Sequence, residues 1–227
     1  MRERTRWFIV VILAIAMAWM ESATVVYLRV LVGRIDPYQA DPLPVSVGLG
    51  KIELIREAAT LIMLLTIGLL ADRTWRSRLA YALIAFGVWD IFYYVFLAII
   101  SAWPRSLLEW DVLFLIPLPW WGPVLAPMLI ALLMIVGGTL VAYADRPVHP
   151  IWPNWKAWAL NLGGVVLALI IFMLPALHSL ANGTESVRQA LPNEFYWLPF
   201  SIALLLMAAP IVDMGRRLAA APALPNS

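Results

Sequence analysis

The sequence predicts an all-α fold, a single-domain bundle of about six transmembrane helices spanning residues 1–227. Of its residues 63% are apolar and 13% are charged, whereas soluble domains lie near half apolar and a quarter charged. The mean hydropathy is +0.85. Sixteen basic and fourteen acidic side chains leave a net charge of only +2. These values exclude an ordinary soluble domain, a disordered chain and a nucleic-acid partner.

Six apolar stretches are long enough to cross a bilayer, since a core of roughly 30 Å needs about 20 apolar helical residues. We expect the spans at about 7–32, 52–71, 79–101, 124–143, 155–180 and 195–214. Pro175, Pro199 and Pro210 are expected to kink the last two spans. The lipid bilayer is therefore the first predicted partner.

Lysine and arginine indicate the orientation, because cytoplasmic segments are enriched in them. With a cytoplasmic N-terminus, ten of the sixteen basic residues lie on the cytoplasmic side: Arg2, Arg4, Arg6, Arg73, Arg76, Arg78, Arg146, Lys156, Arg216 and Arg217. The other six lie in outer loops or outer span ends: Arg29, Arg34, Lys51, Arg56, Arg105 and Arg188. We therefore expect both termini in the cytoplasm of a multi-pass protein of a prokaryotic plasma (inner) membrane.

The segment before the fourth span, 103–127, contains five prolines and cannot form one continuous helix. Its apolar part, 111–118, is too short to span. Near 108–121 we expect a short interfacial helix, with Trp103, Trp110, Trp120 and Trp121 anchored among headgroups. The alternative is a re-entrant helix, which would indicate a pore or a binding site.

Several kinds of chemistry are excluded by residues that the chain lacks. It has no cysteine, so disulfides, iron–sulfur clusters and thiolate chemistry are excluded. Its two histidines, His149 and His178, are expected on opposite membrane faces, which argues against a bis-histidine haem. No nucleotide-binding or hydrolase motif is present. We assign no catalytic residue, no metal ligand and no cofactor from the sequence.

Five ionisable residues lie within predicted spans, where charge is costly and functional roles are common. They are Glu21, Glu53, Arg56, Glu57 and Asp90. A rise of 1.5 Å per residue places Glu21 roughly 21 Å from the inner face and Glu57 roughly 9 Å below the outer one, at a similar level. Asp90 then lies about 16 Å deep, near the midplane.

In the second span, Glu53, Arg56, Glu57 and Thr60 follow the spacing i, i+3, i+4, i+7 and share one face. Arg56 is expected to pair with Glu53 or Glu57, or with Glu21 across the bundle. Such pairs serve either helix register or an ion or proton pathway, and a ligand or cofactor site is a third possibility.

Asp90 precedes Tyr93 and Tyr94 by three and four residues, so either hydroxyl could bond its carboxyl group. The alternative is a midplane proton relay or cation ligand. Two glycine pairs, Gly137–Gly138 and Gly163–Gly164, are expected to let helices approach closely.

Two classes of function remain close, and a third ranks behind them. The absence of motifs and soluble domains favours a non-catalytic subunit of a larger membrane assembly, partnered by other membrane subunits or by itself. The buried carboxylates favour a small transporter or channel for protons, cations or a small solute. An intramembrane enzyme is third, since carboxylates can act as acid and base.

Overall fold

The computed structural model describes residues 3–33, 35–38, 47–115, 117–144, 152–180, 183 and 191–220, without the side chains of 47–50. Within them lie α1 (Glu3–Leu31), α2 (Val47–Ala71), α3 (Trp75–Ser101), β1 (Trp110–Phe114), β2 (Trp120–Pro123), α4 (Leu125–Ala144), α5 (Trp155–Ser179), α7 (Trp197–Met207) and α8 (Ala209–Ala220). Six helical stretches in this part of the chain are long and apolar enough to cross a membrane, counting α7 and α8 together. The protein is thus a mostly helical, multi-pass membrane protein, as predicted.

The helices agree with the predicted spans, and most differ from them only at their ends. The Thr74 hydroxyl accepts a hydrogen bond from the Ser77 N–H, which explains why α3 begins four residues before the predicted span. The Asn154 side chain accepts one from the Ala157 N–H at the predicted start of α5. The sixth stretch is divided at Ala208, just before Pro210. The Met207 carbonyl, near this break, accepts a hydrogen bond of 2.8 Å from the Asn161 side chain. Pro199 lies in the first turn of α7, where proline is tolerated.

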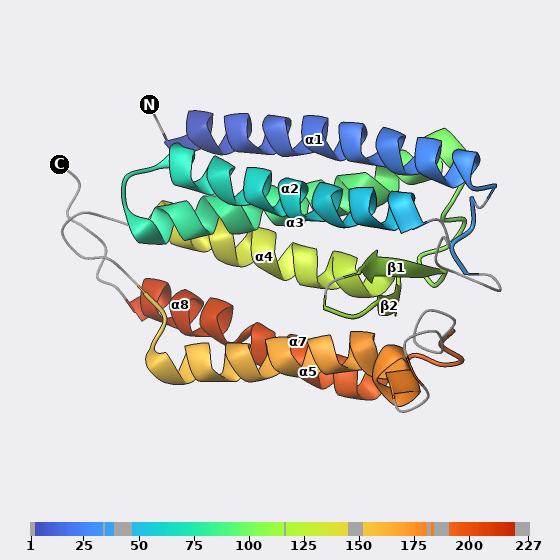
Figure 1. Ribbon diagram of the computed structural model, residues 1–227. Coiled ribbons are helices and arrows are strands. Elements are labelled where there is room, and N and C mark those ends of the chain that lie inside the picture. The colour runs from blue at the N-terminus through green and yellow to red at the C-terminus, as the bar shows by residue number, and fades with distance from the viewer. Residues whose placement is uncertain are drawn as a thin grey trace.

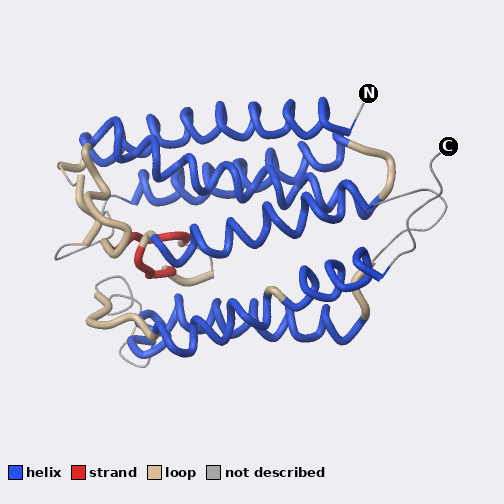
Figure 2. Tube along the Cα trace, turned by 180° about the vertical axis from the view of Figure 1, so that it is seen from behind, coloured by secondary structure: helices blue, strands red, loops and turns tan. Residues whose placement is uncertain are grey.

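The helices form two groups, which Figures 1 and 2 show from opposite sides. In the first group α3 packs against α1, α2 and α4, and in the second α5 packs against α7 and α8. The first described turn of α1 and the last turn of α8 lie at the same end of the bundle (Figure 1). The strands lie toward the other end, between the two groups, and we call this the hairpin end.

Glycines let backbones approach closely within each group. A Cβ on Gly138 of α4 would lie 2.6 Å from the Ala80 carbonyl oxygen of α3. A Cβ on Gly164 of α5 would likewise lie 2.6 Å from the Ala203 carbonyl oxygen of α7. The other glycine of each pair is not at a close backbone contact. A Cβ on Gly137 would reach only the Ile211 side chain at 3.3 Å, and one on Gly163 would meet open space. One glycine of each predicted pair therefore lies at a tight helix crossing.

The expected interfacial or re-entrant helix near 108–121 is wrong, because this segment forms an antiparallel hairpin of β1 and β2. The prolines prevent a helix, and alternating side chains instead pack on two sides of a short ribbon. The expected headgroup anchoring fails for Trp103 and Trp121, which are buried within the protein. A Cβ on Gly122 would lie 2.9 Å from the Phe172 ring, so this glycine lets the hairpin approach α5.

Some sequence-based expectations fall on residues outside the described ranges. They concern the positions of Arg2, Arg34, Arg146, Arg188 and His149. His178 is described and lies exposed near the end of α5.

Candidate functional site

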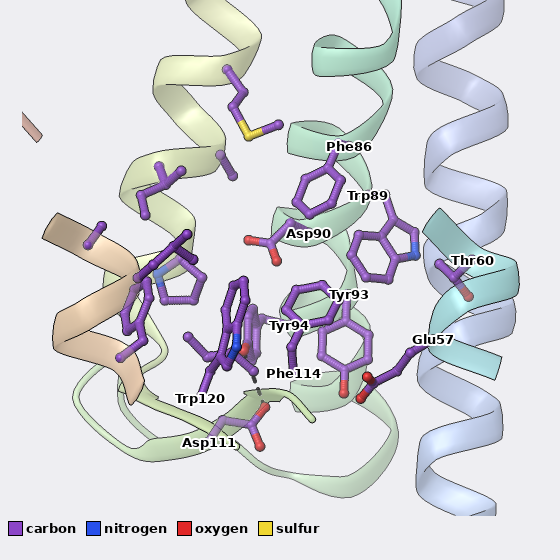
Figure 3. A pocket seen from close by; sticks show the side chains of 18 of the residues that line it. Glu57, Thr60, Phe86, Trp89, Asp90, Tyr93, Tyr94, Asp111, Phe114 and Trp120 are labelled. Atoms are coloured by element: carbon purple, nitrogen blue, oxygen red, sulfur yellow. Dashed lines mark hydrogen bonds between the residues drawn. The ribbon is translucent and has the colours of Figure 1, made fainter. Parts of the chain in front are cut away.

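A cavity of about 570 Å³ lies between the two helix groups. Its wall is built by residues from all six candidate membrane-spanning stretches and from the hairpin. All eight polar candidates from the first three spans, Glu21, Glu53, Arg56, Glu57, Thr60, Asp90, Tyr93 and Tyr94, line it. The tertiary structure therefore gathers them around one space, part of which Figure 3 shows.

Arg56 lies at the centre of an ion-pair cluster that joins α1 to α2. It pairs with Glu21 across the helix contact and with Glu53 one turn earlier on α2. The Thr60 hydroxyl donates a hydrogen bond of 3.0 Å to Glu21. Both sequence-based expectations of a partner for Arg56, one on its own helix and one across the bundle, are thus met by different carboxylates. Glu53, Arg56 and Thr60 lie on one face of α2, and all three take part in this cluster.

Glu57 has a different partner from the rest of the α2 face. Its carboxylate accepts a hydrogen bond of 3.2 Å from the backbone N–H of Leu115, directly after β1. Glu57 is 8% exposed and points toward the cavity in Figure 3. It therefore ties α2 to the hairpin.

A second charged cluster, the Asp111 cluster, fastens the hairpin to α1 and α3. Asp111 of β1 accepts hydrogen bonds from the Arg29 guanidinium at 2.9 Å and from the Tyr94 hydroxyl at 3.2 Å. It also accepts one from the Val112 N–H at 2.9 Å, and the Arg29 guanidinium lies 4.3 Å from the Trp103 ring centroid. Burial raises the pKa of the Asp111 carboxyl, while Arg29 and the other donors oppose this change.

Sequence reasoning did not select Asp111 or Arg29 as site residues. The sequence predicts an interfacial or re-entrant helix around Asp111 and places Arg29 at the outer membrane interface. A carboxylate within an apolar run from Trp110 to Leu115 was the signal that could have identified the first. Its partner lies 82 positions away in the chain, so the pair itself required the tertiary fold.

Among the described carboxylates that line the cavity, Asp90 on α3 is the one with an oxygen atom, Oδ2, that is buried without a hydrogen-bond partner. The expected bonds from the neighbouring tyrosines are not formed, since the Tyr94 hydroxyl bonds Asp111 and no bond joins Tyr93 to Asp90 among the described residues. Figure 3 shows the carboxylate toward the middle of the cavity, between Phe86 on one side and the two tyrosines on the other. Asp90 thus faces the cavity, and no described side chain forms a hydrogen bond with its Oδ2 atom.

The remainder of the cavity wall is mostly apolar. It includes Phe114 and Trp120 of the hairpin, whose ring centroids lie 5.2 Å apart. Trp120 also stacks on Phe172 of α5 with an interplanar angle of 7°. Three flexible methionines, Met134, Met207 and Met214, come from α4, α7 and α8. The cavity therefore has a polar wall on α1–α3 and a mostly apolar wall on α4, α5, α7 and α8.

Within the described ranges, no group of three or more acidic or histidine side chains could hold a metal ion. Concave, largely apolar pockets with a few polar groups are typical of sites for small molecules.

Comparisons of the chain with protein-family models, with curated proteins and with solved structures find no match.

Proposed function

We propose that this protein is a small transporter, which moves protons or a small solute across a membrane through the cavity. The observation that carries the proposal is the presence of Asp90, with a buried and unpartnered carboxylate oxygen, in a cavity of about 570 Å³. Ionisable groups inside a membrane protein are costly, and those facing a cavity mark substrate and ion pathways. Glu57, which also lines this cavity, is the second carboxylate that we assign to the pathway.

The grouping of the helices also supports transport. The cavity lies between two groups of helices, α1 to α4 in one and α5, α7 and α8 in the other, and contacts across it are fewer than contacts within each group. Transporters alternate access by moving one helix group against another around a central site. Here the hairpin would close one end of that site, held by the Asp111 cluster and by Glu57.

We also propose an orientation of the chain in the membrane. A cytoplasmic N-terminus and C-terminus in a prokaryotic plasma membrane agree with the lysine and arginine distribution. The hairpin end of the cavity would then face the outside of the cell. The subunit and enzyme hypotheses stay predictions of the sequence.

The test is ion flux through the purified protein in liposomes. A pH-sensitive dye inside the vesicles reports proton entry driven by an imposed membrane potential. We expect Glu57→Gln and Asp90→Asn each to lower the flux at least tenfold. Glu194→Gln, a change of an exposed carboxylate outside the cavity, is the matched control and should leave the flux unchanged.

Equal flux in vesicles with and without protein would contradict proton movement. Solute movement is tested separately with the labelled cation used below. Purification in mild detergent tests the leading alternative, because stoichiometric foreign subunits would make the chain a component of a larger assembly.

A further inference from the structure

The carboxylates that line the cavity differ in how many ion-pair and hydrogen-bond partners they have. Glu21 and Glu53 share Arg56. Asp111 has Arg29 and two further donors, and Glu57 accepts a backbone N–H. Among the described carboxylates that line the cavity, Asp90 alone has a buried oxygen without a partner.

The cavity also has an excess of acidic groups. Five carboxylates and two guanidinium groups line it, and both guanidinium groups are engaged by other carboxylates. A buried charge without compensation is strongly unfavourable in a site of low dielectric constant. The fold supplies no basic side chain to Asp90 among the described ion pairs. Compensation has to enter from outside, as a proton or as a cationic ligand.

The surroundings of Asp90 suit an organic cation better than an inorganic one. Small metal cations need several oxygen ligands, and one carboxylate supplies at most two. Phe86, Tyr93 and Tyr94 lie at i−4, i+3 and i+4 from Asp90, so they share its side of α3, and all three line the cavity. Aromatic faces attract a bulky ammonium-type cation in addition to the carboxylate.

The opposite wall suits an apolar body attached to that cation. Met134, Met207 and Met214 line it, and methionine side chains adapt to ligands of different shape. A volume of about 570 Å³ lies within the range of pockets for drug-sized molecules. The site is therefore amphipathic, with one negative charge beside aromatic rings and an adaptable apolar surface.

We infer that the cavity binds an organic cation with an apolar body, whose charged centre pairs with Asp90 between the aromatic side chains of α3. This inference rests on the proposed function, since it names the substrate class of the same site. It assigns Asp90 as the counter-ion, while the Arg56 and Asp111 clusters shape the cavity.

Binding of radiolabelled tetraphenylphosphonium to the full chain in lipid nanodiscs tests the inference without requiring transport. Tetraphenylborate has nearly the same shape and the opposite charge. It therefore distinguishes binding that depends on positive charge from non-specific partition of an apolar ion into the lipid. We expect saturable binding of the cation at one site per chain, and no saturable binding of the anion. Asp90→Asn should weaken binding of the cation at least tenfold, and Glu194→Gln should leave it unchanged.

A second variant covers the case in which Asp90→Asn does not fold. Met134→Trp fills the cavity while leaving Asp90 in place, and it should weaken binding of the cation at least tenfold. Saturable binding of both ions, equal affinity in Asp90→Asn and wild type, or no binding by wild type would each overturn the inference.

The two proposals fail in distinguishable ways. Asp90-dependent binding of tetraphenylphosphonium, without uptake of the same label into liposomes, would remove transport and leave the ligand class intact. Proton flux that depends on Asp90, without binding of the cation, would leave transport intact and remove the ligand class.

Discussion

Asp111 and Asp90 are two carboxylates on one cavity wall that are similarly removed from solvent. Their exposed fractions are 1% and 8%. Asp111 accepts hydrogen bonds from a guanidinium, a hydroxyl and a backbone N–H, whereas one oxygen of Asp90 is buried and has no donor in the part of the chain that the structure describes. The degree of burial therefore does not distinguish a carboxylate that is paired within the fold from one that is not, and the hydrogen-bond partners do.

The difference has an energetic meaning. Removing one partner of a buried ion pair leaves the other charge uncompensated, at a cost of about 3–5 kcal/mol. A carboxylate without a partner inside the protein loses no such interaction when another side chain replaces it. The two residues should thus respond in opposite ways to substitution.

The largest effect is expected for Arg29→Met, which leaves Asp111 buried beside Tyr94 without its cation. We expect the free energy of unfolding to fall by about 3–5 kcal/mol. Unfolding of the purified protein by sodium dodecyl sulfate in mixed micelles, followed by tryptophan fluorescence, measures the change.

The double variant Arg29→Met with Asp111→Asn is the control for this prediction. An asparagine carries no charge and still accepts hydrogen bonds through its carbonyl oxygen. It should recover most of the lost stability. A double variant as unstable as the single one would show that the ion pair is not the cause.

A smaller effect is expected for Tyr94→Phe, which removes one hydrogen-bond donor from Asp111. Leaving a buried acceptor short of a donor costs about 1–3 kcal/mol. Tyr93→Phe is the matched control at the adjacent position, because no described hydrogen bond joins the Tyr93 hydroxyl to Asp111 or Asp90. Its unfolding free energy should stay within about 0.5 kcal/mol of wild type. Equal losses in the two variants would contradict the distinction between them.

The smallest effect on stability is expected for Asp90→Leu. Because this carboxylate has no cationic partner among the described ion pairs, an apolar side chain of similar size should leave stability unchanged or raise it by up to about 1 kcal/mol. The same unfolding measurement reports it. A loss above 2 kcal/mol would place Asp90 with Asp111 as a structural charge and would weaken the proposed site.

The membrane class and the helical spans follow from the sequence alone, for a simple physical reason. A span of about 20 apolar residues can satisfy its backbone in lipid only as a helix, so composition and length decide the element. The polar face that runs from Glu53 to Thr60 could likewise be predicted from the sequence, because helical periodicity places its residues on one side of the helix. These properties depend on neighbours within a few turns.

The hairpin, the cavity and the partners of Asp111 and Glu57 were decided only by the tertiary structure. The segment 108–121 is short and rich in aromatic residues and prolines, so local preference did not separate a surface helix from a ribbon between helix groups. The contact of Arg29 with Asp111 spans 82 positions, and that of Glu57 with Leu115 spans 58. Pairings of this kind depend on how the helices are arranged around one another, which no local pattern encodes.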